Sequence, residues 1–579
     1  MALFNLTLSP ALPSSRRRRP DGWLLLVLAL AVLAMAPILA VLGVALQPSG
    51  DLWAHLFDTL LGRYALVSAQ LCLLVGAGVL VVGVGTAWLV TTCRFPGRGV
   101  LEWALLLPLA MPAYLAAYAY TDLLEYAGPL QTMLREAFGW GRADYWFPEV
   151  RSMGGAALFM TLVLYPYVYL LTRAAFLEQS AALLEAARSM GRGPWRVFLT
   201  VALPLARPAI VVGVLLALME TLNDFGTVDY FAVPTFTVGI YRVWFGMGNV
   251  TGAAQLASGL VAVVVALIWL ERRARRNRRF GSGESRGQPF SRIILRGPRA
   301  WLALLACAAP VLLGFAVPAA VLLHSALGRW SAVDGAQLGL LTLNSLMVST
   351  LVAVVCLAVG VLLAYGHRLR PRPLVAVSVR LASLGYAMPG AVLAIGVIIP
   401  AAWLDARVIA WVEAATGHKL PLLLSGTLAA LVFACAVRFL PLAEGAIASG
   451  LTKITPRMDD AARSLGESAA GALRRVHLPL LRGSALTAVL LVFVDCMKEL
   501  PMTLILRPFN FSTLATHVYE YASSEMFRDA APAALAIVVA GLLPVILLSR
   551  EIARPRTGFR QGRDGHAPPT GEETQWYAQ

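Results

Sequence analysis

The sequence predicts an all-α polytopic membrane protein with about twelve transmembrane helices in two tandem repeats. Three observations lead to this prediction: the composition, the number of long apolar runs, and an internal repetition of the chain. Of the 579 residues, 58% are hydrophobic and 14% are charged, whereas soluble globular chains have about 45–50% and about 25%. The mean hydropathy is +0.71. This composition excludes an ordinary soluble protein.

A transmembrane helix needs about 20 apolar residues, because its backbone groups must be hydrogen-bonded within the segment. The first apolar run follows Arg16–Arg19 as in a signal peptide, but it reaches Gln47 without a small-residue cleavage pattern. We therefore interpret it as an anchored helix. Twelve runs are long enough, at approximately residues 23–46, 65–91, 101–123, 154–174, 205–225, 253–270, 301–324, 342–366, 376–403, 422–442, 480–500 and 531–549.

Basic residues gather in alternate segments between these runs, most densely at Arg272–Arg279 between the sixth and seventh. Because short loops rich in Lys and Arg stay inside, both termini are predicted to be cytoplasmic in a bacterial inner membrane. We interpret the dense cluster as a topology signal, with an anionic-lipid site as the alternative. The net charge is +16, but the basic residues lie between apolar runs, which does not indicate a nucleic-acid partner. The six cysteines lack metal-ligand spacing, so no disulfide framework or zinc site is expected.

The chain repeats itself. Glu185–Gly191 (EAARSMG) matches Asp460–Gly466 (DAARSLG) at a displacement of 275 residues, and upstream Met111-Pro112 matches Met388-Pro389 at 277. The 275-residue displacement also pairs Leu203 with Leu478, Arg207 with Arg482, Glu220 with Asp495, and Asp224 with Glu499. Six spans per copy is an even number, so both copies face the same way, and a pathway is expected between them.

This repetition predicts the domain organisation. The first repeat covers residues 1–270 with a long cytoplasmic loop at 178–204, and the second covers residues 301–552 with the matching loop at 453–479. Between them lies a basic cytoplasmic linker at 271–300, whose Gly, Ser and Pro content indicates flexibility. The tail, residues 553–579, is polar and is predicted to be disordered.

Each long cytoplasmic loop predicts a short helix that is ended by a glycine, so that a helix end is presented outside the membrane. The repeated motif resembles the EAA loops of ABC importer permeases. This resemblance implies the MetI-like (type I importer) fold and implies that each loop docks on a cytoplasmic ATPase subunit. The implied coupling residues are Glu185, Ala186, Gly191, Asp460, Ala461 and Gly466. Asp460 departs from the pattern, because it is one methylene shorter than Glu.

The resemblance also implies partners. No G-x-x-x-x-G-K-[ST] phosphate loop occurs in the chain. The chain is therefore expected to be a translocation subunit and not an enzyme, with no cofactor of its own. ATP and Mg would be bound by two copies of a partner ATPase, and cargo would be delivered by a periplasmic or lipid-anchored binding protein.

Acidic residues lie near the outer ends of two predicted spans. Within each copy they are four residues apart, which places both carboxylates on one face of a helix. Acids inside a membrane usually face a bundle interior or a wet pathway, and carboxylate oxygens suit hard cations. The predicted path residues are Glu220, Asp224, Asp229, Tyr230, Asp495 and Glu499, and no metal site is assigned with certainty. The alternative is a structural role, in which these acids pair with Lys498, Arg207 or Arg482 or cap helices at the bilayer edge.

The segments ETLNDFGTVDYF, at 220–231, and KELPMTLILRPF, at 498–509, resemble ferric-iron permeases among the fused ABC importers. Ferric iron is therefore the expected cargo. Thiamine and phosphonate permeases share this architecture and remain alternatives. An ion-coupled secondary transporter is an alternative of another class, since twelve spans in two parallel halves also describe that group, and a channel is a weaker one.

Overall fold

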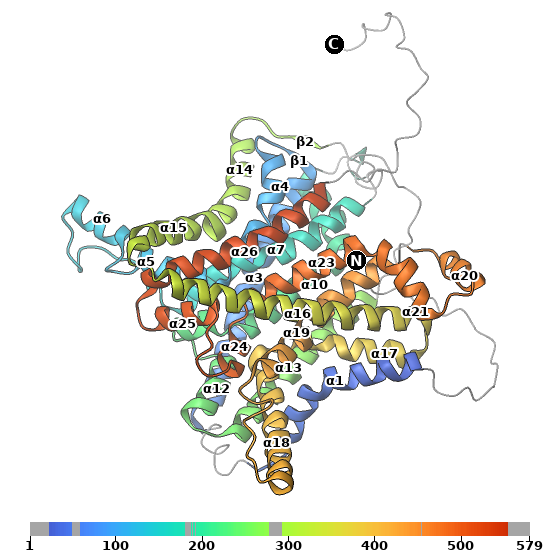
Figure 1. Ribbon diagram of the computed structural model, residues 1–579. Coiled ribbons are helices and arrows are strands. Elements are labelled where there is room, and N and C mark those ends of the chain that lie inside the picture. Colours follow the sequence, from blue (N-terminus) through green and yellow to red (C-terminus); the bar gives the residue numbers. More distant parts are fainter. Residues whose placement is uncertain are drawn as a thin grey trace, which may run out of the picture.

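The computed structural model describes residues 22–48, 58–179, 187, 189–190, 193–276, 292–452 and 454–553 (Figure 1). Before the predicted linker it contains α1 (Gly22–Ala45), α3 (Leu61–Thr92), β1 (Cys93–Arg94), α4 (Arg98–Ala104), η1 (Leu107–Ala110), α5 (Ala113–Leu124), α6 (Pro129–Phe138), α7 (Met153–Glu178), α9 (Pro194–Val197), η2 (Phe198–Ala202), α10 (Leu203–Asn223), α11 (Gly226–Tyr230), α12 (Phe236–Tyr241), η3 (Arg242–Gly246) and α13 (Val250–Arg276).

The second half of the chain repeats this order with small differences. It contains β2 (Ile293–Ile294), α14 (Pro298–Val311), η4 (Leu312–Ala316), α15 (Val317–Arg329), η5 (Trp330–Ala332), α16 (Gly335–Leu369), α17 (Pro373–Ala382), η6 (Ser383–Ala387), α18 (Gly390–Thr416), α19 (Leu428–Leu451), α20 (Pro456–Ser464), α21 (Ala469–Ala472), η7 (Leu473–His477), α22 (Leu478–Leu480), α23 (Arg482–Met497), α24 (Pro501–Leu506), α25 (Leu514–Ser523) and α26 (Phe527–Ala553).

Ten helices of the described chain are long and apolar enough to cross a membrane, and two bent pairs raise the number to twelve. The predicted fold class, an all-α membrane protein with about twelve spans, is therefore confirmed. Two of the long helices, α7 and α16, begin at a side-chain cap that satisfies free backbone N–H groups. Asp334, for example, accepts hydrogen bonds from Ala336 N at 2.9 Å and Gln337 N at 3.2 Å at the start of α16.

Three predicted spans are not straight helices, which corrects the sequence analysis. The run at 101–123 bends by 91° between η1 and α5. The run at 376–403 is divided between the α17–η6 helix and α18, and the run at 480–500 bends by 78° where α22 meets α23. Met111 and Met388 have extended ψ angles of 113° and 133°. A residue before proline is disfavoured in the α conformation, which explains the first two breaks.

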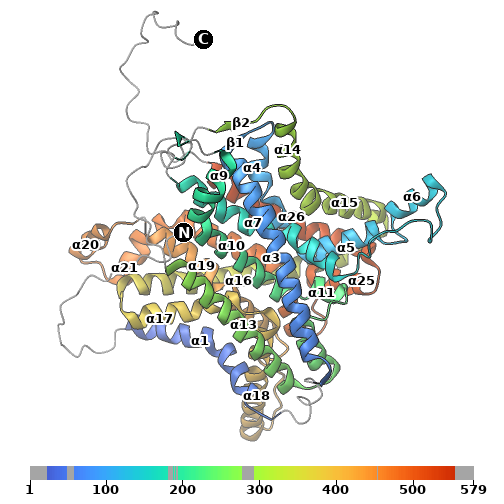
Figure 2. The same cartoon turned by 180° about the vertical axis from the view of Figure 1, so that it is seen from behind.

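The long helices run between two opposite ends of the molecule. α6 and α25 lie at one end, and α20 and α21 lie at the other, in both views (Figures 1 and 2). α7 and α19, which occupy matching places in the two halves, are the most buried of the long helices. They form the centre around which the other spans pack.

Small residues allow this close packing. A Cβ atom on Gly83 of α3 would lie 2.7 Å from Val168 Cβ of α7. Gly360, which lies 277 residues later, occupies the same place between α16 and α19, where a Cβ would lie 3.0 Å from the backbone of Glu444. Helices without a bulky side chain at the crossing approach closely, and this is a common basis of packing in membranes.

The halves are interlocked by their first helices. α1 packs against α17 and α18 of the second half, and α15 packs against α5 of the first. The Pro37 carbonyl in α1 lies 2.2 Å from where a Cβ on Gly396 of α18 would be placed. The two repeats are therefore held together by exchanged helices as well as by the contacts at their centre.

The end of the predicted linker is ordered. Ile293 and Ile294 form β2, which pairs in parallel with β1, and Leu295 N donates to Arg94 O at 3.0 Å. α14 then begins at Pro298. The interpretation of 271–300 as a flexible linker is therefore wrong for its last residues, because they satisfy backbone groups at the end of β1. Residues 277–291 and the tail from 554 lie outside the described residues.

Candidate functional site

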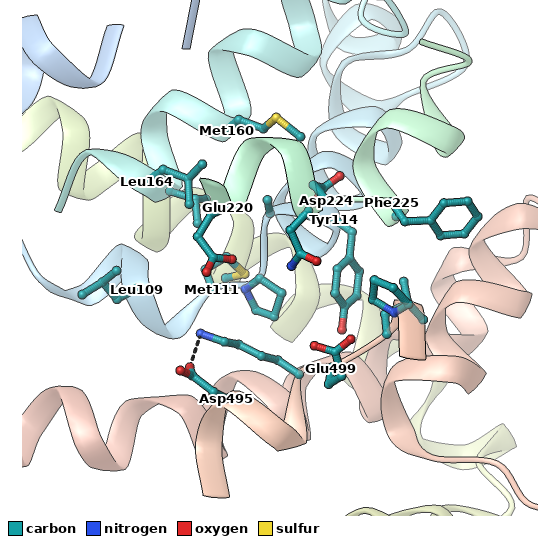
Figure 3. A pocket seen from close by; sticks show the side chains of 18 of the residues that line it. Leu109, Met111, Tyr114, Met160, Leu164, Glu220, Asp224, Phe225, Asp495 and Glu499 are labelled. Carbon is teal, nitrogen blue, oxygen red and sulfur yellow. Dashed lines mark ion pairs between the residues drawn. The ribbon is translucent and has the colours of Figure 1, made fainter. Parts of the chain in front are cut away.

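A cavity of about 110 Å³ lies between the two halves, lined by the middle of α7 and α19 and by the ends of α10 and α23 (Figure 3). The first half contributes residues of η1, α5, α7, α10 and α11, and the second contributes residues of η6, α19, α23 and α24. Its ionisable lining consists of four acids, two bases and three tyrosines: Glu220, Asp224, Asp495, Glu499, Arg438, Lys498, Tyr114, Tyr167 and Tyr386.

The acids of each pair do not share one helical face, which corrects the expectation from their spacing. α10 ends at Asn223, and Asp224 has an extended ψ of 133°. Its carboxylate accepts hydrogen bonds from Thr227 N at 2.9 Å, Thr227 Oγ1 at 3.0 Å and Val228 N at 3.3 Å. Asp224 thus satisfies the free N–H groups at the start of α11.

The second half repeats this arrangement with one acid on the helix and one beyond it. Asp495 lies in the last turn of α23 and forms an ion pair with Lys498 Nζ at 2.8 Å. Glu499 lies after the helix end and accepts a hydrogen bond from Met502 N at 3.2 Å. The four acids therefore reach one cavity because the ends of α10 and α23 lie on its two sides.

Arg438 joins the halves at this cavity. Its Nη1 donates to Asn223 Oδ1 at 2.7 Å, and its Nε lies 3.6 Å from Glu499 Oε2. Asn223 Oδ1 also accepts a hydrogen bond from Gly390 N at 2.7 Å. A Cβ on Gly390 would lie 2.9 Å from Glu499 Oε1, so this crossing accepts only glycine without a shift. The pairing bases are Lys498, which the sequence analysis named, and Arg438, whereas Arg207 and Arg482 are exposed.

Polar side chains from both halves are directed toward the interior of the cavity. The side chain of Tyr114 is 5% exposed, and its hydroxyl has no hydrogen-bond partner among the described residues. Figure 3 shows this hydroxyl pointing toward Glu499, while Glu220 and Asp495 face each other from the two halves. A buried hydroxyl without a partner is costly, which makes it a group that a cargo or a water molecule would satisfy.

Asp229 and Tyr230 do not line this cavity. Asp229 Oδ2 accepts a hydrogen bond from Tyr519 OH of α25 at 2.7 Å. Burial raises the pKa of Tyr519, which keeps its hydroxyl protonated as the donor. Tyr230 lies instead under Arg151, whose guanidinium carbon is 4.7 Å from the ring centre.

Tyr230 belongs to a second, polar pocket of about 380 Å³ at the end of the molecule that carries α6 and α25. Ion pairs cross between the halves here. Arg151 contacts Glu525 at 3.2 Å, and Arg528 contacts Asp122 at 2.9 Å. We call the residues Asp122, Glu125, Arg151, Glu525 and Arg528 the outer rim. They join the halves on the side opposite α20.

The second predicted coupling segment forms α20, which lies at the far end from the outer rim (Figure 1). The side chain of Asp460 is 72% exposed and pairs with Arg463 at 3.7 Å. Gly466 follows the helix with φ +81°, and nothing lies within 4 Å of where its Cβ would be. Glycine is thus favoured there by backbone conformation. Glu185, Ala186 and Gly191 lie outside the described residues.

Three side chains hold α20 against α16. Arg368 of α16 lies 2.8 Å from Asp459 and donates to Leu451 O at 2.6 Å and Ile454 O at 2.8 Å. His477 Nε2 lies 2.7 Å from the other oxygen of Asp459. We call Arg368, Asp459 and His477 the α20 anchor.

Sequence reasoning missed the participation of Arg438, Asn223 and Tyr114. An arginine inside an apolar run is itself a signal, because such a charge is costly in a membrane unless it has partners. The other two carry no comparable signal, since an asparagine and a tyrosine near a helix end are common. Among the described residues, no three His, Cys, Asp or Glu side chains are close enough to bind one metal ion together.

Comparisons with known proteins connect this architecture to transport. Residues 356–556 match the family described as "Binding-protein-dependent transport system inner membrane component". The chain is 26% identical over 543 residues to the Fe(3+)-transport system permease protein FbpB 2 of Haemophilus influenzae, covering 92% of this chain and 99% of that one.

Shorter relatives match only part of the chain. The molybdenum transport system permease protein ModB of Escherichia coli is 32% identical over 205 residues, which cover 33% of this chain and 86% of ModB. The putative 2-aminoethylphosphonate transport system permease protein PhnU of Salmonella choleraesuis is 29% identical over 259 residues, covering 43% of this chain and 89% of PhnU. The relative that covers both halves and the relatives that cover one half or less are all named as transport permeases. The chain therefore belongs to the family of inner-membrane components of binding-protein-dependent ABC transport systems, as a fused permease with two halves.

Proposed function

We propose that this permease passes ferric iron across the bacterial inner membrane, through the cavity between its halves. The observation that carries the proposal is the charge of the cavity lining, where four carboxylates face two basic side chains. Ferric iron is a hard cation, and carboxylate oxygens are ligands that hard cations prefer. The proposed path residues are Glu220, Asp224, Asp495 and Glu499, with Tyr114 as a further oxygen donor.

The same charges disfavour anionic cargo. Each basic side chain of the lining already contacts an acid, Lys498 with Asp495 and Arg438 with Glu499. A phosphonate would therefore meet uncompensated carboxylates and be repelled. Thiamine is a cation and remains the closer alternative. The named cargo of the full-length relative, Fe(3+), adds support because that similarity covers both halves.

Energy would come from ATP hydrolysis in separate subunits. We propose that two copies of a cytoplasmic ATPase, which bind ATP and Mg, dock on the two long loops. The docking residues would be Glu185, Ala186 and Gly191 in the first loop and Asp460, Ala461 and Gly466 in the second. The exposure of Asp460 on a helix at one end of the molecule supports docking there. Both chain termini would then lie in the cytoplasm.

An external binding protein would deliver cargo at the opposite end, above the outer rim. We propose the repeat boundaries 1–270 and 301–552 from the internal repetition of the chain. An ion-coupled secondary transporter would need neither a coupling helix nor a binding protein. Membership in a binding-protein-dependent family therefore speaks against that alternative.

The cargo is tested by uptake in a bacterial strain that lacks its own iron, thiamine and phosphonate permeases. The chain is expressed with its ATPase and binding protein, and uptake of radiolabelled ferric iron, thiamine and 2-aminoethylphosphonate is measured separately. We expect ATP-dependent uptake of iron only. Uptake of thiamine or the phosphonate without iron would overturn the proposed cargo, and uptake without ATP would overturn the proposed energy source.

A further inference from the structure

The two basic residues of the cavity are held very differently. Arg438 is enclosed, with a side chain that is 4% exposed, and it contacts Asn223 and Glu499 from different halves. Lys498 is 27% exposed and contacts Asp495, three residues earlier in its own segment. Arg438 is therefore enclosed and bonded to both halves, whereas the Lys498 side chain is more exposed and contacts an acid of its own segment.

The position of Lys498 differs between the repeats. The 275-residue displacement places Asn223 at the matching position of the first half, and both residues line the cavity. Asn223 is occupied by hydrogen bonds to Arg438 and Gly390. The duplicated acids are thus present in both halves, while the lysine is present in one.

The ammonium lies among carboxylates that would attract a cationic cargo. It contacts Asp495, and Glu220 of the first half lines the same cavity. Figure 3 shows these two carboxylates facing each other, with the ion pair of Asp495 dashed. The Tyr114 hydroxyl, which is buried and lacks a partner among the described residues, is a further oxygen in the cavity that a ligand would satisfy.

We propose that Lys498 is a tethered cation that occupies the carboxylates of the cavity when cargo is absent and is displaced by a hard, multiply charged cation. This proposal rests on the proposed function and adds a residue that determines specificity. A monovalent ion gains little by replacing an ammonium of equal charge. A trivalent ion interacts about three times as strongly with the same carboxylates, so the tether favours highly charged cargo.

A purely structural role makes a different prediction. Lys498 follows the last residue of α23, where a positive charge is favoured by the helix dipole. If that were its whole role, removing the charge would lower thermal stability and leave cation binding in the cavity unchanged. The two roles are therefore separated by measuring cation affinity as well as stability.

The experiment uses the full-length chain in lipid nanodiscs and Tb³⁺ as a hard trivalent probe. Tyr114, Tyr167 and Tyr386 line the cavity, so Tb³⁺ bound there is excited through tyrosine and emits light. The signal that Glu220→Gln removes is assigned to the cavity. We expect Lys498→Gln to tighten this binding about tenfold or more, because one competing positive charge is gone.

The chain offers a matched control. Lys419 lies 3.6 Å from Glu413 on an exposed loop, away from the cavity. Lys419→Gln removes the same charge and is expected to leave the cavity affinity unchanged, and Lys498→Arg, which keeps the charge, is expected to do the same. Unchanged or weaker Tb³⁺ binding in Lys498→Gln, or no cavity signal in any variant, overturns the proposal.

A second measurement needs no variant. The chain has three lysines, Lys419, Lys453 and Lys498, so amine dimethylation at each is resolved by mass spectrometry. Tb³⁺ is expected to increase labelling of Lys498 relative to Lys419 several-fold, because the displaced ammonium leaves Asp495. Equal labelling with and without Tb³⁺ overturns the proposal even if Lys498→Gln does not fold.

Failure of this proposal is distinguishable from failure of the proposed function. Tb³⁺ binding reports on the cavity alone, whereas cargo identity is read from uptake. Iron uptake with unchanged Tb³⁺ binding in Lys498→Gln would reject only the tether. Tightened Tb³⁺ binding in a chain that transports another cation would reject only iron.

Discussion

The two halves supply the same acids to the central cavity but different neighbours for them. Arg438 of α19 corresponds to Val163 of α7, and Lys498 corresponds to Asn223, each at a displacement of 275 residues. All four of these residues line the cavity. The duplicated carboxylates are therefore shared by both halves of the cavity, whereas its two bases come from the second half alone.

A similar asymmetry appears at the end of the molecule that carries α20. The α20 anchor consists of Arg368, Asp459 and His477, and the matching positions of the first half hold Thr91, Leu184 and Ala202. The second loop is thus tied to its long helix by charge, while the first has no ionisable residue at any of the three positions. The two repeats therefore differ in the contacts that their sequences allow at this end.

The largest expected effect comes from removing Arg438. Arg438→Met leaves Glu499 enclosed without its ion-pair partner, and breaking such a pair typically costs about 3–5 kcal/mol. Thermal unfolding in detergent should show a large loss of stability. The double variant Arg438→Met with Glu499→Gln should recover much of it, because no unpaired charge remains. Equal stability of the single variant and wild type would show that the cross-half contact is dispensable.

The second prediction compares the ends of the two coupling loops. Gly466→Leu forces a branched side chain to a φ of +81°, a strain of about 1–3 kcal/mol. We expect it to displace the end of α20 and to lower transport per ATP hydrolysed at least several-fold. Gly483→Ala, in open space on α23, is the control. Gly191→Leu should lower transport per ATP hydrolysed in the same way if both loops dock on the ATPase. Unchanged transport per ATP hydrolysed in both leucine variants would count against docking.

The third prediction sharpens the contrast at the α20 anchor. Arg368→Gln removes the charge that holds Asp459 and weakens hydrogen bonds to two carbonyls, at a cost of about 1–3 kcal/mol. We expect protease cleavage within residues 453–479 to accelerate, because α20 separates from α16. Thr91→Ala, the matching change, removes a hydrogen bond to its own helix and should leave that cleavage unchanged. Identical effects of both changes would erase the asymmetry.

The smallest expected effect concerns the outer rim. Arg528→Gln breaks an ion pair between the halves, whereas Arg329→Gln breaks a similar pair, with Asp529, within one half. Both are partly exposed, so each contributes at most about 1 kcal/mol to stability. If the rim closes the outer side of the path, only Arg528→Gln should raise basal ATP hydrolysis, by up to about fivefold. An equal rise in both would indicate a general surface effect.

Much of the fold follows from the sequence because long apolar runs and a fixed displacement are local properties of the chain. Met111 and Met388 each precede a proline, which the sequence shows, but the bend or division of the span at these residues does not follow from the sequence. Asp224 and Glu499 depart from one helical face because each helix ends one or two residues earlier. That ending depends on the hydrogen bonds the acids make to α11 and α24.

The rest of the candidate site depends on which helices meet. Arg438 and Asn223 are 215 residues apart in the chain, and only the packing of α19 against the end of α10 brings them together. Asp229 and Tyr230 follow directly after the predicted acids, yet α11 turns them toward α25 and Arg151. Proximity in sequence thus grouped Asp229 and Tyr230 with residues of a cavity that they do not line, and it named Lys498 as a pairing base but not Arg438.

The claim that the shared carboxylates carry the cargo is tested most directly by ATP-driven uptake of radiolabelled ferric iron into sealed vesicles. Wild type is compared with the double variant Glu220→Gln with Asp495→Asn, and with Glu413→Gln as a matched neutralisation of an exposed acid. We predict that uptake by the double variant falls at least tenfold at equal protein level, while Glu413→Gln transports normally. Wild-type uptake by the double variant would contradict the account.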